Sequence, residues 1–240
     1  MKNKKLLSVL VFIGVIALAV FLFYQAFVQT VVEILPILQH ADVEEIAGYL
    51  RASNSVKGLI ATIILQMIQV WTIIISGIPI QVAAGVVYGT PKAFITCHLA
   101  TVAAMTIAMC GYRRAHNRLD EWFPKGSFIW KYIERIQSMN TPPRYTTVLA
   151  CMIPAVPNGI IPIVAARMDI TPKEFAAATW IGCFPNILIC CAIGNRLIKG
   201  DFTIALLYFL LMIGMVTLLW VFRDQVLKIL RYIVHDVLHL

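Results

Sequence analysis

The 240-residue sequence is 60% apolar and only 13% charged. This composition predicts an integral membrane protein and leaves no polar stretch long enough for a soluble catalytic domain. The net charge of +8 would suit nucleic acid, but the basic residues concentrate beside the apolar runs, where they set topology and meet anionic lipid headgroups, so nucleic acid is excluded as a partner.

The chain begins with an apolar segment that is predicted to be an N-terminal transmembrane anchor over residues 1–32. Lys2, Lys4 and Lys5 precede the charge-free run Leu6–Val32. This run is far longer than the ~7–15 apolar residues of a signal peptide, and no clean cleavage site follows it. The basic start places the N-terminus in the cytoplasm.

Residues 33–57 are predicted to form an interfacial segment on the outer side of the membrane. Acidic residues outnumber basic ones there, and the spacing Asp42-x-x-Glu45 is typical of a helix start. The apolar face of this short helix is expected to lie on the membrane surface, and it consists of Ile46, Tyr49 and Leu50.

The amphipathic loop 113–144 determines the path of the two segments before it. It carries seven Lys or Arg against three Asp or Glu, which places it in the cytoplasm. Segment 92–112 is therefore predicted to cross the membrane inward, and segment 58–91 must begin and end outside. We predict that 58–91 is a re-entrant hairpin, broken at Ser76–Pro79 because Gly and Pro there cannot continue a regular helix.

The second half mirrors this arrangement from the cytoplasmic side. Segment 145–168 is predicted to be a second re-entrant hairpin, since it contains Pro154, Pro157, Asn158, Gly159 and Pro162. Segments 174–196 and 202–222 then cross outward and back, which leaves an amphipathic tail, 223–240, in the cytoplasm. The predicted fold is an all-α polytopic membrane protein with about four full crossings and two opposed hairpins. Six full spans are the alternative.

A five-residue motif recurs and indicates a duplicated unit. Thr90-Pro91-Lys92-Ala93-Phe94 returns as Thr171-Pro172-Lys173-Glu174-Phe175. In each copy the Thr is expected to cap a helix and the Pro to fit its first position, and Glu174 completes a capping box in the second copy. Each copy follows a broken segment and opens a crossing helix, once on each side of the membrane, which predicts an inverted repeat.

Four stretches resemble motifs of a known family. They are Ala83-Ala84-Gly85-Val86-Val87-Tyr88-Gly89, like A-G-x-x-[FY]-G; Ile153-Pro154-Ala155-Val156-Pro157, like a P-x-x-P hairpin; Arg113-Arg114; and Phe175 with Gly182-x-x-Pro185. The chain resembles the DedA-like superfamily, also called the VTT-domain or SNARE-associated Golgi protein family, and is most similar to its Golgi Tvp-like branch. The resemblance covers about Gly77–Leu197. It implies two re-entrant hairpins and the movement or scrambling of lipids, which in bacteria include the polyprenyl-phosphate carrier of wall synthesis.

The two breaks supply most of the candidate substrate-path residues. Opposed hairpin tips would meet near the membrane midplane and offer free N–H groups and helix dipoles to a polar headgroup. The alternative is that the breaks only shape a static fold, and Gly85-x-x-x-Gly89 is also a close-packing signature. The candidates are Gly77, Pro79, Gln81, Gly85 and Gly89 in the first hairpin and Pro154, Pro157, Asn158 and Gly159 in the second.

Other polar side chains complete the candidate set. Gln66 and Gln69 share a helix face and either line a headgroup path or hydrogen-bond a neighbouring helix. His98 is titratable inside a span and is a candidate proton relay, with a neutral imidazole bonded to a backbone carbonyl as the alternative. Arg167 suits a lipid phosphate or sets topology. The six cysteines lie in apolar runs without C-x-x-C, which argues against disulfides and metal, and no cofactor is expected.

The predicted function is scrambling or translocation of a phospholipid or polyprenyl phosphate in the plasma membrane. The expected partners are membrane lipids with anionic headgroups, and both termini are expected in the cytoplasm. A small-solute or ion transporter with the same architecture is the alternative. A membrane lipid phosphatase is a further alternative, but it requires intramembrane acidic residues and a Ser/Arg phosphate cluster. The long apolar runs lack Asp, Glu and Arg, so we predict that the protein is not an enzyme.

Overall fold

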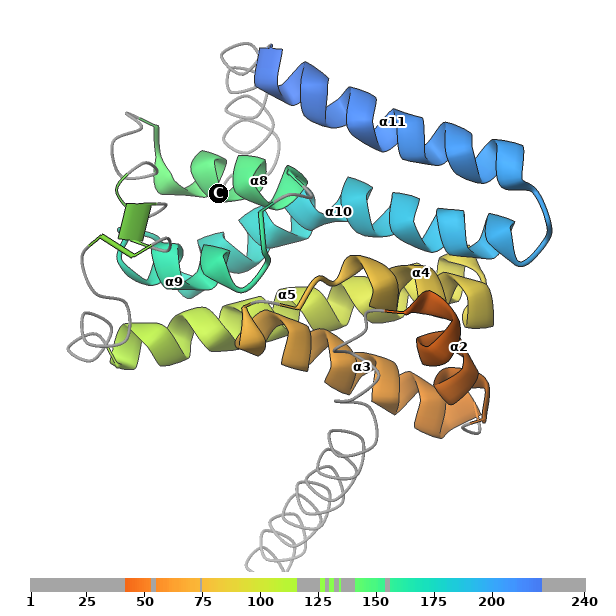
Figure 1. The fold of residues 1–240 in the computed structure, drawn as a ribbon. Coiled ribbons are helices and arrows are strands. Elements are labelled where there is room, and N and C mark those ends of the chain that lie inside the picture. The colour runs from red at the N-terminus through yellow and green to blue at the C-terminus, as the bar shows by residue number, and fades with distance from the viewer. Residues whose placement is uncertain are drawn as a thin grey trace, which may run out of the picture.

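A computed structural model gives the structure of the protein, and the part of the chain it describes consists of helices and the turns that connect them (Figure 1). The described residues are 42–52, 55–73, 75–115, 126–127, 130–131, 134, 141–153 and 156–221. The helices are α2 (Val43–Ala52), α3 (Ser55–Thr72), α4 (Ile78–Tyr88), α5 (Thr90–Arg114), α8 (Pro143–Met152), α9 (Ile160–Ala166), α10 (Pro172–Leu197) and α11 (Phe202–Val221). The predicted anchor 1–32, the tail 223–240 and most of the loop 113–144 lie outside the described residues.

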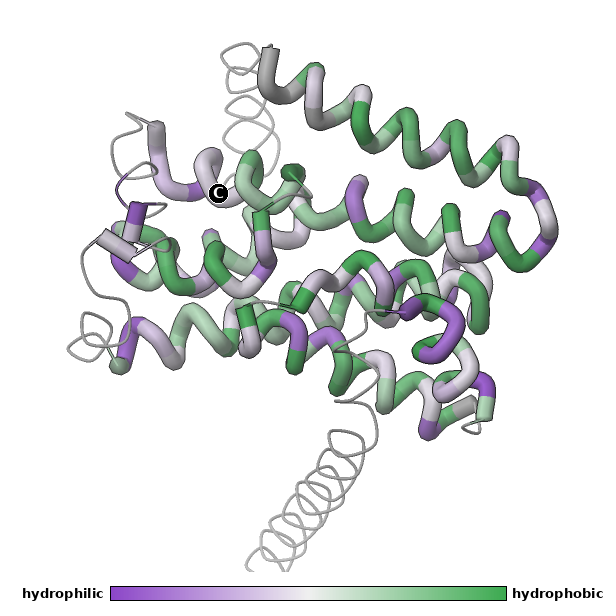
Figure 2. Tube along the Cα trace, in the orientation of Figure 1, coloured by the Kyte–Doolittle hydropathy of each residue, from purple (hydrophilic) through white to green (hydrophobic). Residues whose placement is uncertain are grey.

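Two long helices occupy the centre of the fold and run in opposite directions (Figure 1). Within the described residues, α5 and α10 are the helices long and apolar enough to cross a membrane. They coincide with the predicted crossings 92–112 and 174–196. The last predicted crossing, 202–222, coincides with α11, which packs along α10 and is apolar along most of its length (Figure 2). The full count of four crossings stays a prediction.

The two copies of the repeated motif start their helices differently. At α10 the predicted capping box is confirmed, because the Thr171 hydroxyl accepts from the Glu174 N–H at 3.2 Å and the Glu174 carboxylate accepts from the Thr171 N–H at 2.8 Å. At α5 the prediction that Thr90 caps the helix is wrong. The capping residue is Gly89, at φ +73, which donates to Gly85 at the end of α4 and accepts from Ala93 in α5.

The first predicted hairpin is a pair of helices, α3 and α4, separated by residues 73–77. Gly58, near the start of α3, lies directly against the Tyr88 hydroxyl at the end of α4. The start of α3 and the end of α4 therefore lie together, and the break between the two helices lies at the opposite end of the pair. The break therefore lies in the region where the Gly and Pro residues of the sequence predict it. Its re-entrant position in a membrane stays a prediction.

The short helix α2 packs against this pair, which corrects the prediction for its apolar face. Asp42 caps the helix as predicted, accepting from the Glu44 N–H at 2.7 Å. However, Ile46 and Leu50 are 0% and 1% exposed and pack among α3 and α4, so they do not lie on the membrane surface. The cause is that α3 and α4 present an apolar surface of their own, and burying both surfaces against each other removes more area from solvent.

The second predicted hairpin consists of α8 and α9, on either side of residues 153–159. The break includes Pro157, Asn158 and Gly159, as predicted, while Pro154 lies outside the described residues. The prediction that Pro162 contributes to the break is wrong. It sits in the first turn of α9, where a missing N–H costs no intrahelical bond.

The fold contains two helical units, α3–α5 and α8–α10, and each unit packs against helices of the other. The first helix of each unit packs on the long helix of its own unit, α3 on α5 and α8 on α10. The second helix packs on the long helix of the other unit, α4 on α10 and α9 on α5, and α4 also packs on α5, which follows it in the chain. This reciprocity is the packing expected of a duplicated unit, and it brings the two breaks toward the middle of the molecule.

Candidate functional site

The two helix breaks meet. Gly159, in the second break, lies so close to the Val70 carbonyl and the Ile73 backbone at the end of α3 that a Cβ at this position would collide with both. Ile73 itself has φ +65, a left-handed conformation that is rare for a β-branched residue. The contact therefore joins a position without room for a side chain to a strained backbone.

Three buried glutamine side chains lie at the first break. Gln66, Gln69 and Gln81 are 0%, 1% and 1% exposed. Gln69 Nε2 donates to Gln66 Oε1 at 3.2 Å, and Thr101 Oγ1 of α5 donates to the same oxygen at 3.1 Å. The atoms Gln66 Nε2, Gln69 Oε1 and Gln81 Oε1 have no hydrogen-bond partner among the described residues. The cluster therefore has both donor and acceptor capacity that the described part of the chain does not use.

The start of α4 adjoins this cluster. Gly77 is the N-terminal cap of α4, and Pro79 lies in its first turn. A Cβ built at Gly77 would lie 3.1 Å from Gln81 Nε2 and 3.2 Å from Gln69 Oε1, so the glycine faces both amides. The N-terminus of a helix carries a partial positive charge and favours anions. The structure thus brings together Gly77, Pro79, Gln81, Gln66 and Gln69 from the predicted set.

Gly85 and Gly89 have structural roles. A Cβ at Gly85 would collide with the Cys191 carbonyl on α10, and Gly194 on α10 lies equally close to the Val82 carbonyl. Both glycines let α4 and α10 cross at backbone contact, which is the close-packing alternative for Gly85. Gly89 has no such contact, and its role is the positive φ between α4 and α5.

His98 lies among aromatic rings. Its imidazole is 1% exposed and stacks on Phe94 at a centroid distance of 5.1 Å, with Trp180 and Phe184 of α10 edge-on at 4.5 and 5.9 Å. Neither ring nitrogen has a hydrogen-bond partner among the described residues. The predicted alternative of a bond to a backbone carbonyl is therefore not what the structure shows.

Arg167 lies at the base of the second hairpin, at the end of α9. Its guanidinium sits over the Trp130 ring at 4.8 Å, and Trp130 Nε1 donates to Glu134 at 2.6 Å. Arg113, at the end of α5, donates to the carbonyls of Ala165 and Met168 at 3.2 and 3.1 Å. Sequence reasoning missed this role of Arg113, because its partners lie more than 50 residues away.

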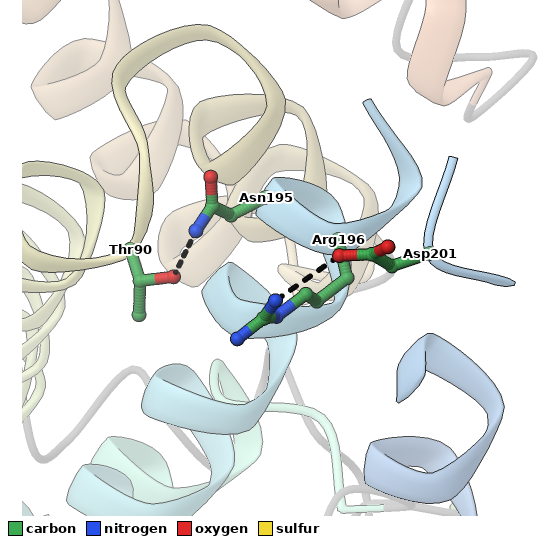
Figure 3. A network of polar contacts seen from close by, with 4 residues as sticks. All are labelled: Thr90, Asn195, Arg196 and Asp201. Atoms are coloured by element: carbon green, nitrogen blue, oxygen red, sulfur yellow. Dashed lines mark hydrogen bonds and ion pairs between the residues drawn. The ribbon is translucent and has the colours of Figure 1, made fainter. Parts of the chain in front are cut away.

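At the opposite end of the molecule, a second polar contact joins the two units. Asn195, near the end of α10, donates from Nδ2 to Thr90 Oγ1 at 3.0 Å, and the neighbouring Arg196 forms an ion pair with Asp201 at 3.1 Å (Figure 3). Each long helix is thus fastened by its last turn to the other unit. All six cysteines are free, and the described residues contain no cluster of His, Cys, Asp or Glu that could hold a metal ion.

Comparison with known proteins identifies a family. The sequence profile of the VTT domain matches residues 75–196, just over half of the chain, from the first break to the last turn of α10. The match specifies no branch of the family, so the Golgi Tvp-like assignment stays a prediction. No curated protein and no solved structure shows a significant match to the chain.

Proposed function

We propose that this chain, which belongs to the VTT domain family, moves the polar headgroup of a phospholipid or polyprenyl phosphate from one leaflet of a membrane to the other. VTT-domain proteins are membrane-associated and are generally proposed to be transporters or scramblases. The lipid substrate and the scrambling reaction are our proposal for this chain.

One observation supports the proposal above the others: the contact between the two helix breaks beside buried, incompletely bonded amides. Leaving a buried polar group without a partner costs about 1–3 kcal/mol. Within the described part of the chain, Gln66, Gln69 and Gln81 each carry one such atom, so polar groups there remain available to a partner. Water, or a headgroup that carries hydroxyl or amine donors as well as phosphate acceptors, would satisfy these atoms. A fold with a purely structural core would gain stability from apolar side chains at the same positions.

The proposal includes a location and a topology. We place the chain in the plasma membrane as a multi-pass protein, with both termini in the cytoplasm and the two hairpins entering from opposite faces. In this arrangement Arg113 and Arg167 lie at the cytoplasmic face, where they would meet anionic headgroups. The Asn195–Thr90 contact then lies at the outer face.

Reconstitution tests the proposal. The purified full chain is placed in vesicles that contain fluorescent phosphatidylglycerol, and a membrane-impermeant quencher is added outside. We expect the quenched fraction of the fluorescence to exceed the fraction of labelled lipid that lies in the outer leaflet. Quenching no greater than in empty vesicles, for this lipid and for a labelled polyprenyl phosphate, would refute lipid movement and favour the small-solute or ion transporter.

A pair of variants locates the path. Gly159→Leu places a side chain where the two breaks meet, and we expect it to abolish lipid movement. Gly214→Leu is the matched control, because Gly214 lies on α11 with no atom of the described chain within 4 Å of a Cβ. Equal activity of the two variants would place the path elsewhere.

A further inference from the structure

The contact between the two breaks lies beyond the middle of α5. Gly58 of α3 meets Tyr88, two residues before α5 begins. Further along both helices, Gln66 of α3 meets Thr101 of α5. The two helices therefore run in the same direction. Ile73 follows Gln66 by about 10 Å at 1.5 Å per residue, so it lies past the middle of α5.

The helix α9 gives the distance from this contact to the end of α5. Gly159, which touches Ile73, is the N-terminal cap of α9. Arg113, in the last turn of α5, donates to Ala165 near the end of α9. Because α9 has 7 residues, these two points are about 10 Å apart along the axis. In the proposed topology the breaks therefore lie within the hydrocarbon layer, which is ~30 Å thick.

Polar side chains reach the surface of the molecule at this depth. Thr72, the last residue of α3, and Ser76, in the first break, are both exposed. Asn158 precedes Gly159 in the second break and is partly exposed. Trp71 is 40% exposed, and its indole prefers the boundary between lipid and water. We call Trp71, Thr72, Ser76 and Asn158 the tip surface.

The tip surface presents both donors and acceptors. Ser76 Oγ accepts from the Ile78 N–H at 3.3 Å, a bond that does not use its own O–H. Thr72 Oγ1 donates to the Ile68 carbonyl at 2.8 Å, a bond that leaves its lone pairs to accept. The amide of Asn158 carries donors and an acceptor in one group. Water and a lipid headgroup can both use this combination.

The surface of α5 differs from the tip surface. It exposes Ile95, Leu99 and Ile107, each by more than half, as expected of a helix that faces lipid. Ile107 lies at about the depth of Ile73 by the same count along the axis. Polar groups exposed to hydrocarbon at that depth are costly, so the tip surface requires a polar neighbour that the face of α5 does not.

Behind the tip surface the molecule is filled. Gly159 touches the Val70 carbonyl and the Ile73 backbone, which leaves no room for a side chain. Val70, Met105 and Ile161 are at most 3% exposed and belong to one apolar cluster of α3, α5 and α9. A headgroup that passed between the breaks would have to separate them. The tip surface, in contrast, is accessible from the side.

We infer that the tip surface is an open path, along which a lipid headgroup crosses the middle of the membrane while the tails of the same lipid stay in the surrounding bilayer. The inference rests on the proposed function and deepens it, because it states where the headgroup passes and which class of substrate fits. A path that is open to the side serves a molecule with a tail. It encloses no pore for a small solute or an ion.

The chemistry of the path suits transit. A headgroup in hydrocarbon loses its hydrogen bonds to water, and the tip surface with its water replaces some of them. The segments 58–91 and 145–166 contain no Asp, Glu, Lys or Arg. The headgroup is therefore held by neutral hydrogen bonds and not by an ion pair, so it can leave as readily as it enters.

The test removes the polar groups without adding bulk. Thr72→Val, Ser76→Ala and Asn158→Leu are combined in the full chain, which is reconstituted with fluorescent phosphatidylglycerol and the external quencher. We expect lipid movement to slow by about tenfold or more, because the headgroup loses its hydrogen bonds at the deepest point. The unfolding temperature in detergent is expected to match that of the control.

The matched control is Thr96→Val with Thr106→Val on the partly exposed side of α5. Each hydroxyl donates to the carbonyl four residues earlier, at 2.9 and 2.8 Å, as Thr72 does. We expect the control to move lipid at the wild-type rate. Equal rates of the control and the tip variant would overturn the inference. If the tip variant unfolds earlier than the control, the three single variants are measured, and wild-type rates in all three would overturn it.

A second lipid distinguishes an open path from an enclosed one. Phosphatidylethanolamine is labelled with the same fluorophore either on the headgroup or on an acyl chain. An open path accepts a wide headgroup, so we expect both lipids to move at similar rates. Movement of the chain-labelled lipid alone would show an enclosed path and overturn the inference.

A spin label separates the tip surface from the proposed function. A nitroxide is attached at Ser76→Cys or at Ile107→Cys, each with Cys110→Ala, since the other five cysteines are at most 3% exposed. In phosphatidylcholine vesicles, a water-soluble nickel chelate is expected to relax the label at position 76 several-fold more than at position 107. If wild type moves no lipid, the proposed function fails and this measurement still tests the tip surface. Equal relaxation at the two positions would overturn it.

Discussion

Asn195 and Thr90 are 105 residues apart in sequence, yet Asn195 Nδ2 donates to Thr90 Oγ1 at 3.0 Å (Figure 3). The bond joins the last turn of α10 to the first residue of α5. At the other end of the molecule, Arg113 joins the last turn of α5 to the carbonyl of Ala165 at the end of α9. The two long helices are therefore joined directly by a polar contact at one end, and at the other end α5 is joined to α9, the helix that precedes α10.

The first prediction concerns the direct contact between the long helices. Asn195→Leu removes the donor and is expected to lower the free energy of unfolding by about 1 kcal/mol, the usual net contribution of one hydrogen bond. Thr90→Val removes the acceptor and is expected to cost a similar amount. Thermal unfolding of the two single variants and the double variant measures the coupling. Strictly additive effects would contradict the bond, because partners in one interaction lose it only once.

The second prediction compares two glycine substitutions in helices. Gly85→Ala puts a Cβ into the Cys191 backbone, so we expect a loss of about 2–3 kcal/mol of stability as α4 and α10 separate. A Cβ at Gly111, in α5, would meet no neighbouring atom of the described chain within 4 Å. Gly111→Ala is therefore expected to raise the free energy of unfolding by up to about 1 kcal/mol, because alanine has the higher helix propensity. The unfolding temperatures should therefore move in opposite directions. A shift in the same direction would show that α4 and α10 do not cross at Gly85.

The sequence predicts the positions of the breaks and of the long helices well, because those depend on local chemistry. Pro79 and Pro157 lack N–H groups wherever the chain places them, and the capping box at Thr171 needs only residues three positions apart. The charge-free runs that become α5 and α10 are likewise a local property.

Contacts between distant segments could not be predicted in this way. The apolar face of α2 has the same pattern whether it meets lipid or protein, so the burial of Ile46 and Leu50 depends on where α3 and α4 lie. Thr101 is an ordinary residue of an apolar helix until Gln66 is placed beside it. The cap at Gly89 was missed for another reason: the positive φ arises from the direct junction of α4 and α5.

The third prediction uses the strained backbone at the meeting of the two breaks. Ile73 has φ +65, a conformation that costs a β-branched or alanine residue about 1 kcal/mol or more and costs glycine little. Ile73→Ala and Ile73→Gly both remove the side chain, but only glycine relieves the backbone. We therefore expect Ile73→Gly to be more stable than Ile73→Ala by about 1 kcal/mol, the reverse of the order in a helix interior. Thermal unfolding of both variants decides the point, and the ordinary order, with alanine more stable, would exclude a left-handed Ile73.

The fourth prediction separates packing from proton transfer at His98. The ring contacts Phe94, Trp180 and Phe184, and its nitrogens have no partner among the described residues. A buried polar ring without hydrogen bonds costs stability, whereas its area packs favourably. His98→Phe keeps the area and removes the polar atoms, so it is expected to be at least as stable as wild type and to move lipid at the same rate.

His98→Ala provides the control for this comparison. It removes the ring and leaves a cavity between α5 and α10, so we expect a loss of about 2–4 kcal/mol of stability. A proton relay predicts another pattern, in which His98→Phe folds normally but loses transport as fully as His98→Ala does. Measuring lipid movement and unfolding temperature on the same preparations distinguishes the two, because packing links activity to stability and a relay does not.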